Sequence, residues 1–245
     1  MTQKPVRAAP RTTSGERNNR LDAFVDAAFA FAVTLLVISA DRIPDTVQSL
    51  LLALKAVPAF AASFIMVALF WYAHVRWSRR YRLETVPATL MSLLLVFLVL
   101  VYVYPLRLLF GTFFAWITGG WLPMPLRDFS YGNDVVLMFI VYGIAFASMS
   151  ACMAGLYAHA WLRRRPLQLT SEEAAAATAD VASYLFFVLA GLASALIAWS
   201  LPDAPKAWQL AIPGFLYFLL SLTALVDGAG RRWGLSRLRA NKRKG

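Results

Sequence analysis

Residues 133–162 read NDVVLMFIVYGIAFASMSACMAGLYAHAWL, a stretch with a single acidic residue, Asp134, and no lysine or arginine. A helix needs about 20 mostly apolar residues to cross the roughly 30 Å hydrocarbon core of a bilayer. Because this stretch exceeds that minimum, it predicts a spanning helix that tilts or extends beyond the hydrocarbon. It therefore indicates an integral membrane protein.

Five further segments satisfy the same length requirement, namely residues 23–40, 56–75, 88–103, 181–201 and 207–226. The third span is short, and we expect it to continue to about Phe110, with Arg107 reaching outward to the membrane surface. The sequence thus predicts an all-α integral membrane protein with six transmembrane helices. Residues 20–230 form the membrane domain, between a disordered basic N-terminus at 1–19 and a basic cytoplasmic tail at 231–245.

The composition of the whole chain agrees with this class. Of the 245 residues, 60% are hydrophobic and 15% are charged, whereas soluble domains average about 45–50% apolar and about 25% charged residues. A soluble enzyme, a disordered chain and a coiled coil are therefore excluded. The single cysteine, Cys152, excludes an internal disulfide and a multi-cysteine metal site. Because no P-loop, H-E-x-x-H, C-x-x-C or G-x-S-x-G motif is present either, we expect no catalytic residue, no metal site and no cofactor.

The net charge of +11 is unevenly distributed along the chain. Nineteen of the 24 lysines and arginines lie in the N-terminus, in the links after the second and fourth spans, and in the tail. Positively charged segments face the cytoplasm, so both termini are expected there. The charge then also attracts anionic lipids of the cytoplasmic leaflet. The basic runs lack interleaved aromatic residues, so we expect no nucleic acid as a partner.

The first span differs from an ordinary membrane anchor because it contains an acidic residue, Asp26. A charged group at the centre of a span costs about 2.5–3.5 kcal/mol, less near its end, so Asp26 requires a partner. We hypothesise a polar cluster of Arg20, Asp26 and His74 that joins the first two spans. A second interpretation stays open, in which Asp22 and Asp26 only favour the N-terminus of the helix through its dipole.

Small and bulky residues separate on this first span at helical spacing. The small-residue face comprises Ala23, Ala27, Ala30 and Thr34, and the bulky face comprises Phe24, Ala28, Phe31, Leu35 and Ile38. Small residues let helices approach closely in lipid. We therefore expect protein neighbours on more than one side of this helix. A similar ridge of Gly143, Ala147, Ala151 and Gly155 in the fourth span, with Gly191 and Ala195 in the fifth, predicts close helix packing there.

Two motifs in the first two spans carry a resemblance to a known family. Arg20-x-x-x-Phe24-x-Asp26, followed by Thr34-Leu35-Leu36-Val37, resembles the first-helix signature of bacterial relatives of the endo-lysosomal potassium channel, transmembrane protein 175. The run from Phe70 through Trp71 to His74 is similar to the aromatic-Trp-x-x-His ending of the family's second helix. The chain departs from the family pattern at Val25, where the family has serine, and at Phe31, where it has isoleucine or leucine.

The resemblance implies a six-helix subunit of a homotetramer in the cell membrane, with a bacterial plasma membrane as the expected location. Four copies of the first helix would surround a potassium-permeable, leak-type pore. The implied pore-lining residues are Phe31, Thr34, Leu35 and Ile38. In such a pore, rings of apolar side chains from the four copies gate by dewetting, and a hydroxyl faces the ion. Two alternatives are a proton-coupled secondary transporter that uses Asp26 and His74, and a non-conducting membrane protein that keeps the family fold.

Overall fold

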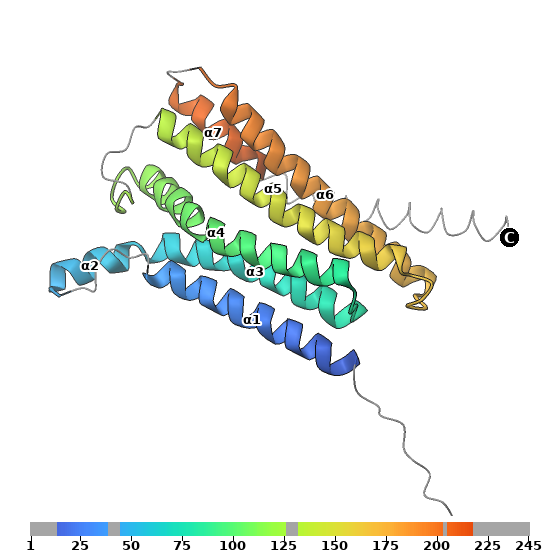
Figure 1. Cartoon of the computed structure of the whole chain (residues 1–245). Helices are drawn as coiled ribbons and strands as arrows, with labels where there is room; N and C mark the ends of the chain where they lie inside the picture. The colour runs from blue at the N-terminus through green and yellow to red at the C-terminus, as the bar shows by residue number, and fades with distance from the viewer. Residues whose placement is uncertain (1–13, 39–44, 126–131, 203–204, 218–245) are drawn as a thin grey trace, which may run out of the picture.

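The computed structural model describes residues 14–38, 45–125, 132–202 and 205–217, and within these ranges every regular element is a helix. The elements are α1 (Ser14–Ile38), α2 (Val47–Lys55), α3 (Val57–Tyr81), α4 (Val86–Ile117), α5 (Asn133–Leu162), α6 (Ser171–Trp199) and α7 (Ala207–Phe215). Figure 1 shows α1, α3, α4, α5 and α6 side by side in one elongated bundle, with α7 beside α5 and α6. The predicted all-α class is confirmed.

Four of the described helices, α3 to α6, are long and apolar enough to cross a membrane. The bounds of α5 coincide with the predicted span at 133–162, whereas α4 runs well beyond the predicted 88–103. The helix α1 begins at Ser14, so the last residues of the segment that we expected to be disordered belong to this helix. The tail at 231–245 and residues 218–226 of the predicted sixth span lie outside the described residues.

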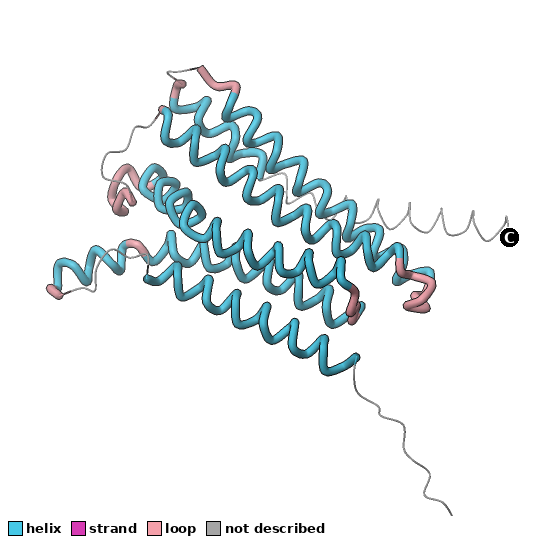
Figure 2. Tube along the Cα trace, viewed as in Figure 1, coloured by secondary structure: helices cyan, strands magenta, loops and turns pink. Residues whose placement is uncertain are grey.

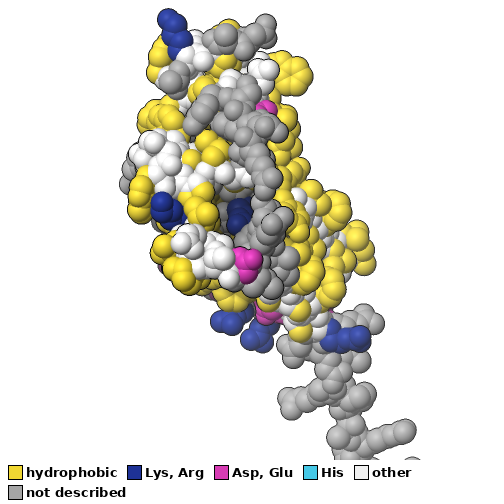
Figure 3. All heavy atoms as spheres, turned by 90° about the vertical axis from the view of Figure 1, so that its left-hand side faces the viewer, with side chains coloured by type: hydrophobic (Ala, Val, Ile, Leu, Met, Phe, Trp, Pro, Cys, Tyr) yellow, Lys and Arg dark blue, Asp and Glu magenta, His cyan; other side chains and the backbone are white. Residues whose placement is uncertain are grey.

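Alternating helix directions bring the basic links to one end of the bundle. The start of α1, the link from α3 to α4 and the link from α5 to α6 all lie there, as the connecting loops in Figure 2 show. We call this the basic end, defined by Arg79, Arg80, Arg82 and residues 163–165. The opposite end, which faces the viewer in Figure 3, presents mostly apolar side chains and only a few basic ones.

Local signals explain where the helices begin. Thr170 caps α6 by accepting a hydrogen bond from the backbone N–H of Glu173, whose carboxylate accepts in return from the backbone N–H of Thr170 at 2.8 Å. Pro58 lies in the first turn of α3, where no N–H is needed. The short helix α2 precedes it and projects from the bundle (Figure 1), with no buried side chain.

The closest helix pair is α5 with α6, because glycines meet there. A Cβ atom added to Gly143 would lie 2.5 Å from the carbonyl oxygen of Gly191, and one added to Gly191 would lie 2.7 Å from that of Gly143. Ala147 and Ala195 flank this contact. The predicted close packing is confirmed here, but not along the whole ridge. Gly155 instead faces the sulfur of Met91 on α4.

Candidate functional site

Helix α1 lies at the edge of the bundle (Figure 1). The other described helices cover only one side of it. The buried row is Val25, Phe29, Ala32 and Leu36, which pack against α3 and α4. This row belongs to neither of the two faces that the sequence pattern separated. The other side of the helix, including Phe24, Ala27, Phe31 and Thr34, is exposed in the protomer.

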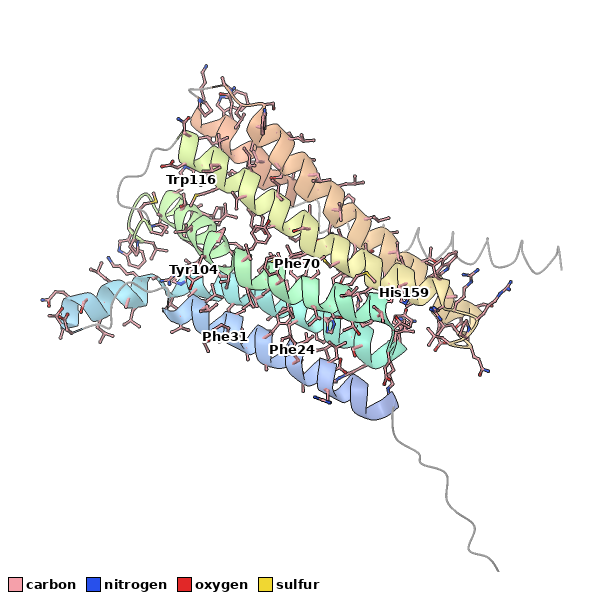
Figure 4. The ribbon with its side chains drawn as sticks, viewed as in Figure 1. Phe24, Phe31, Phe70, Tyr104, Trp116 and His159 are labelled. Carbon is pink, nitrogen blue, oxygen red and sulfur yellow. The ribbon has the colours of Figure 1, made fainter. Side chains whose placement is uncertain are left out.

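Two of the four expected pore-lining residues lie on this uncovered side. The side chain of Phe31 is 55% exposed, and Figure 4 marks it on α1 with Phe24 about two turns away. Thr34 is also exposed, and its hydroxyl donates a hydrogen bond of 2.6 Å to the carbonyl oxygen of Phe31. Leu35 is half-buried. The side chain of Ile38 lies outside the described residues.

Two carboxylates of α1 join it to α3. The indole N–H of Trp71 donates to Oδ1 of Asp26 at 2.8 Å, and the hydroxyl of Ser78 donates to Oδ1 of Asp22 at 2.6 Å. Because α1 begins at Ser14, both carboxylates lie beyond its first turn, where the helix dipole has little effect. Their contacts to α3 therefore explain them better than the dipole does.

The hypothesised cluster of Arg20, Asp26 and His74 is not brought together by direct contacts. His74 is buried, and its Nε2 lies 2.9 Å from the hydroxyl of Ser92 on α4. Arg20 is exposed and forms no ion pair with any residue that the structure describes. The partner of Asp26 is Trp71, which lies in the motif quoted from the second span. The sequence could have indicated this pair, because the indole N–H of a tryptophan usually requires a hydrogen-bond acceptor.

Arginines on α3 and α4 make contacts that the sequence did not predict. Arg76 donates to Asp180 on α6 at 3.0 Å and to the hydroxyl of Tyr157 on α5 at 3.2 Å. Arg107, expected to reach outward to the membrane surface, donates to the carbonyl oxygen of Leu36 at 3.1 Å. The last carbonyls of a helix lack intrahelical partners and attract a cation, which accounts for this contact.

No group of three or more His, Cys, Asp or Glu side chains that could hold a metal ion occurs among the described residues. The uncovered side of α1 presents mostly aromatic and small side chains, together with the hydroxyl of Thr34 and the carboxylate of Asp26. It offers contacts to ions, to lipid or to other copies of the chain.

Replacing Trp71 with phenylalanine is expected to lower the stability of the folded protein by about 1 kcal/mol, because the aromatic packing remains while the bond to Asp26 is lost. Asp26→Asn should cost less, since an amide oxygen still accepts from the indole. Thermal unfolding in detergent checks both variants. A larger loss for Asp26→Asn than for Trp71→Phe would show that the carboxylate charge has another role.

The fold and this surface define a multi-span helical membrane protein with a peripheral first helix. Comparisons with known proteins identify the family. The profile described as "Endosomal/lysosomal potassium channel TMEM175" matches residues 20–105. A protein of Marivirga tractuosa named "Potassium channel" is 30% identical over 220 residues, covering 87% of each chain. The chain belongs to the TMEM175 family of potassium channels, as the motifs predicted, and not to a family of enzymes.

Solved structures agree with this assignment. A threonine-to-alanine variant of the potassium channel MtTMEM175, bound to a nanobody fusion protein, superposes with a TM-score of 0.72 at 28% identity, covering 86% of this chain and 91% of that one. A TMEM175 homologue from Chamaesiphon minutus superposes with a TM-score of 0.56 at 21% identity, covering 86% of this chain and 98% of that one. The second likeness shows the fold alone.

Proposed function

We propose that the protein is the subunit of a potassium-selective, leak-type channel in which four copies assemble with α1 at the centre. The observation that carries this proposal is the uncovered side of α1, which bears Phe31 and Thr34 while the opposite side packs against α3 and α4. A helix with one side packed and the other free can line an axis shared between copies. Family membership supplies potassium as the permeant ion.

The chemistry of Phe31 and Thr34 fits a pore without a charged filter. Four Phe31 rings form an apolar constriction that closes by dewetting. The hydroxyl of Thr34 uses its hydrogen for the Phe31 carbonyl, so its oxygen lone pairs remain available to a cation. Leu35 and Ile38 complete the proposed lining, and the bonds from α3 to Asp22 and Asp26 hold α1 in place.

The proposed subunit has six membrane-spanning helices, with the first and last joining the four long apolar ones. The basic end of the bundle faces the cytoplasm, in accordance with the positive-inside rule. This orientation places the basic residues against the anionic lipids of the inner leaflet of a bacterial plasma membrane.

Reconstituted liposomes test the proposal. With a potassium gradient across the membrane, the protein is expected to pass potassium rapidly down the gradient, and a matched sodium gradient should give much less flux. Liposomes without protein serve as the control. A slower, saturable flux linked to protons would instead indicate a transporter, and an absence of flux would indicate a non-conducting member of the family.

A further inference from the structure

A group of charges at the basic end is not used by the proposed pore. Arg76 and Arg80 lie about one turn apart on α3, and both approach a single carboxylate, Asp180 on α6. The distance is 3.0 Å from Arg76 Nη2 to Oδ1 of Asp180, and 3.8 Å from Arg80 Nη1 to Oδ2. Since one carboxylate faces two guanidinium groups, these three side chains together carry an excess of positive charge, which the carboxylate of Glu173 near Arg80 offsets in part.

The two arginines are held differently. Arg76 donates hydrogen bonds to Asp180 and Tyr157, and its side chain is 49% exposed. Arg80 lies too far from Asp180 for a hydrogen bond, rests 5.4 Å from the ring centre of Tyr81, and is 33% exposed. A guanidinium carries five N–H donors in a planar fork. Arg80 is therefore positioned by its neighbours while its donors remain open to another anion.

The hydroxyl of Tyr81 is a second indication of an incomplete polar site. This hydroxyl is buried and has no hydrogen-bond partner among the described residues. Its ring meets the ring of Tyr157 edge-on at 6.0 Å, which places Tyr81 beside both arginines. A buried hydroxyl without a partner costs about 1–3 kcal/mol. An oxygen-rich ligand, or the water that accompanies one, would relieve that cost.

We propose that Arg80, with Arg76 beside it, binds the phosphate group of an anionic phospholipid between the basic ends of α3 and α6. The guanidinium fork matches the oxygen atoms of a phosphate. Basic residues at the cytoplasmic boundary of a membrane protein attract anionic headgroups. The inference rests on the proposed function only in placing this end at the inner leaflet. Asp180 holds both arginines in position when no lipid is bound.

The test titrates the purified full-length protein in detergent micelles with phosphatidylglycerol and follows thermal unfolding, with phosphatidylcholine as the uncharged comparison. Arg80→Gln is expected to weaken the apparent affinity for phosphatidylglycerol about tenfold or more, because it removes charge-assisted hydrogen bonds. Arg79→Gln is the matched control, since Arg79 is exposed on the same turn. It should weaken binding no more than about fivefold, the general contribution of one surface charge.

Equal effects of Arg79→Gln and Arg80→Gln would overturn the proposal in favour of diffuse attraction. If inorganic phosphate at matched ionic strength stabilises the protein as much as phosphatidylglycerol does, the proposal that a lipid supplies the phosphate group is wrong. Arg80→Lys keeps the charge but loses the fork, so an intermediate affinity supports the site, and an unchanged affinity contradicts the proposed fork geometry.

Binding in micelles depends neither on flux nor on orientation, so the two proposals fail separately. Orientation is measured by labelling Glu84→Cys, in the link between α3 and α4, with a membrane-impermeant maleimide. The native Cys152 is buried and is replaced by alanine. Labelling only after cell lysis supports the inner-leaflet placement. Labelling in intact cells would overturn that placement together with the proposed channel orientation, whatever the micelle titration shows.

Discussion

Phe31→Ala is expected to raise potassium flux through the reconstituted protein several-fold. The ring of Phe31 is more than half exposed, on the side of α1 that no other described part of the protomer covers. If four such rings converge on the axis, they form the apolar constriction of the proposed pore. Truncation to alanine widens this ring and makes it less able to exclude water, so ions meet a lower barrier. Potassium-gradient liposomes measure the change directly.

Phe97→Ala provides the matched control for this experiment. Phe97 lies on α4 and is 60% exposed, close to the exposure of Phe31. Its removal deletes the same ring from a helix outside the proposed pore lining, and flux should not change. Equal flux in wild type and Phe31→Ala would show that Phe31 does not form the constriction. An increase in both variants would indicate a general leak from a disturbed bundle.

Gly143→Leu is expected to abolish the folded protein, and Gly143→Ala to destabilise it by about 1–3 kcal/mol. A Cβ atom at this position would lie 2.5 Å from a backbone carbonyl oxygen of Gly191, which cannot move aside without shifting α6. This cost exceeds the gain of about 1 kcal/mol that alanine normally brings to a helix in place of glycine. Thermal unfolding and the yield of monodisperse protein report the loss.

The same change at Gly155 separates packing from helix propensity. A Cβ atom there would lie 2.7 Å from the sulfur of Met91, the flexible part of a long side chain that can adopt another rotamer. Gly155→Ala should therefore be neutral or slightly stabilising. A loss as large as that of Gly143→Ala would mean that the contact between α4 and α5 is as rigid as the contact between α5 and α6.

The apolar runs were sufficient to predict the helical class and the four long helices α3 to α6, because lipid demands a minimum length of apolar helix whatever surrounds it. The predicted start of the second span at residue 56 agrees with α3, which begins at Val57. Pro58 disrupts a helix in its interior but is tolerated in the first turn, and the separate helix α2 ahead of it decided between these cases.

The candidate site was also predicted from the sequence only in part. The sequence identified α1 as unusual through Asp26 and its small residues, and the motifs at 20–37 and 70–74 determined the family. The partners of the polar groups were not predictable. Asp26 bonds to Trp71 and His74 to Ser92, because the rotation of each helix about its axis selects among several candidates at the same depth.

The sequence by itself therefore determined the membrane class, the identity of α1 as the distinctive helix and the family, since each depends on local composition or on a contiguous motif. Only the tertiary structure decided which side of α1 stays uncovered, that Arg107 meets the end of α1, and that Arg76 and Arg80 share Asp180. The physical reason is that a long, flexible polar side chain binds whichever partner lies within reach. The distances between helices depend on how all the helices pack together, and the sequence of one span does not determine them.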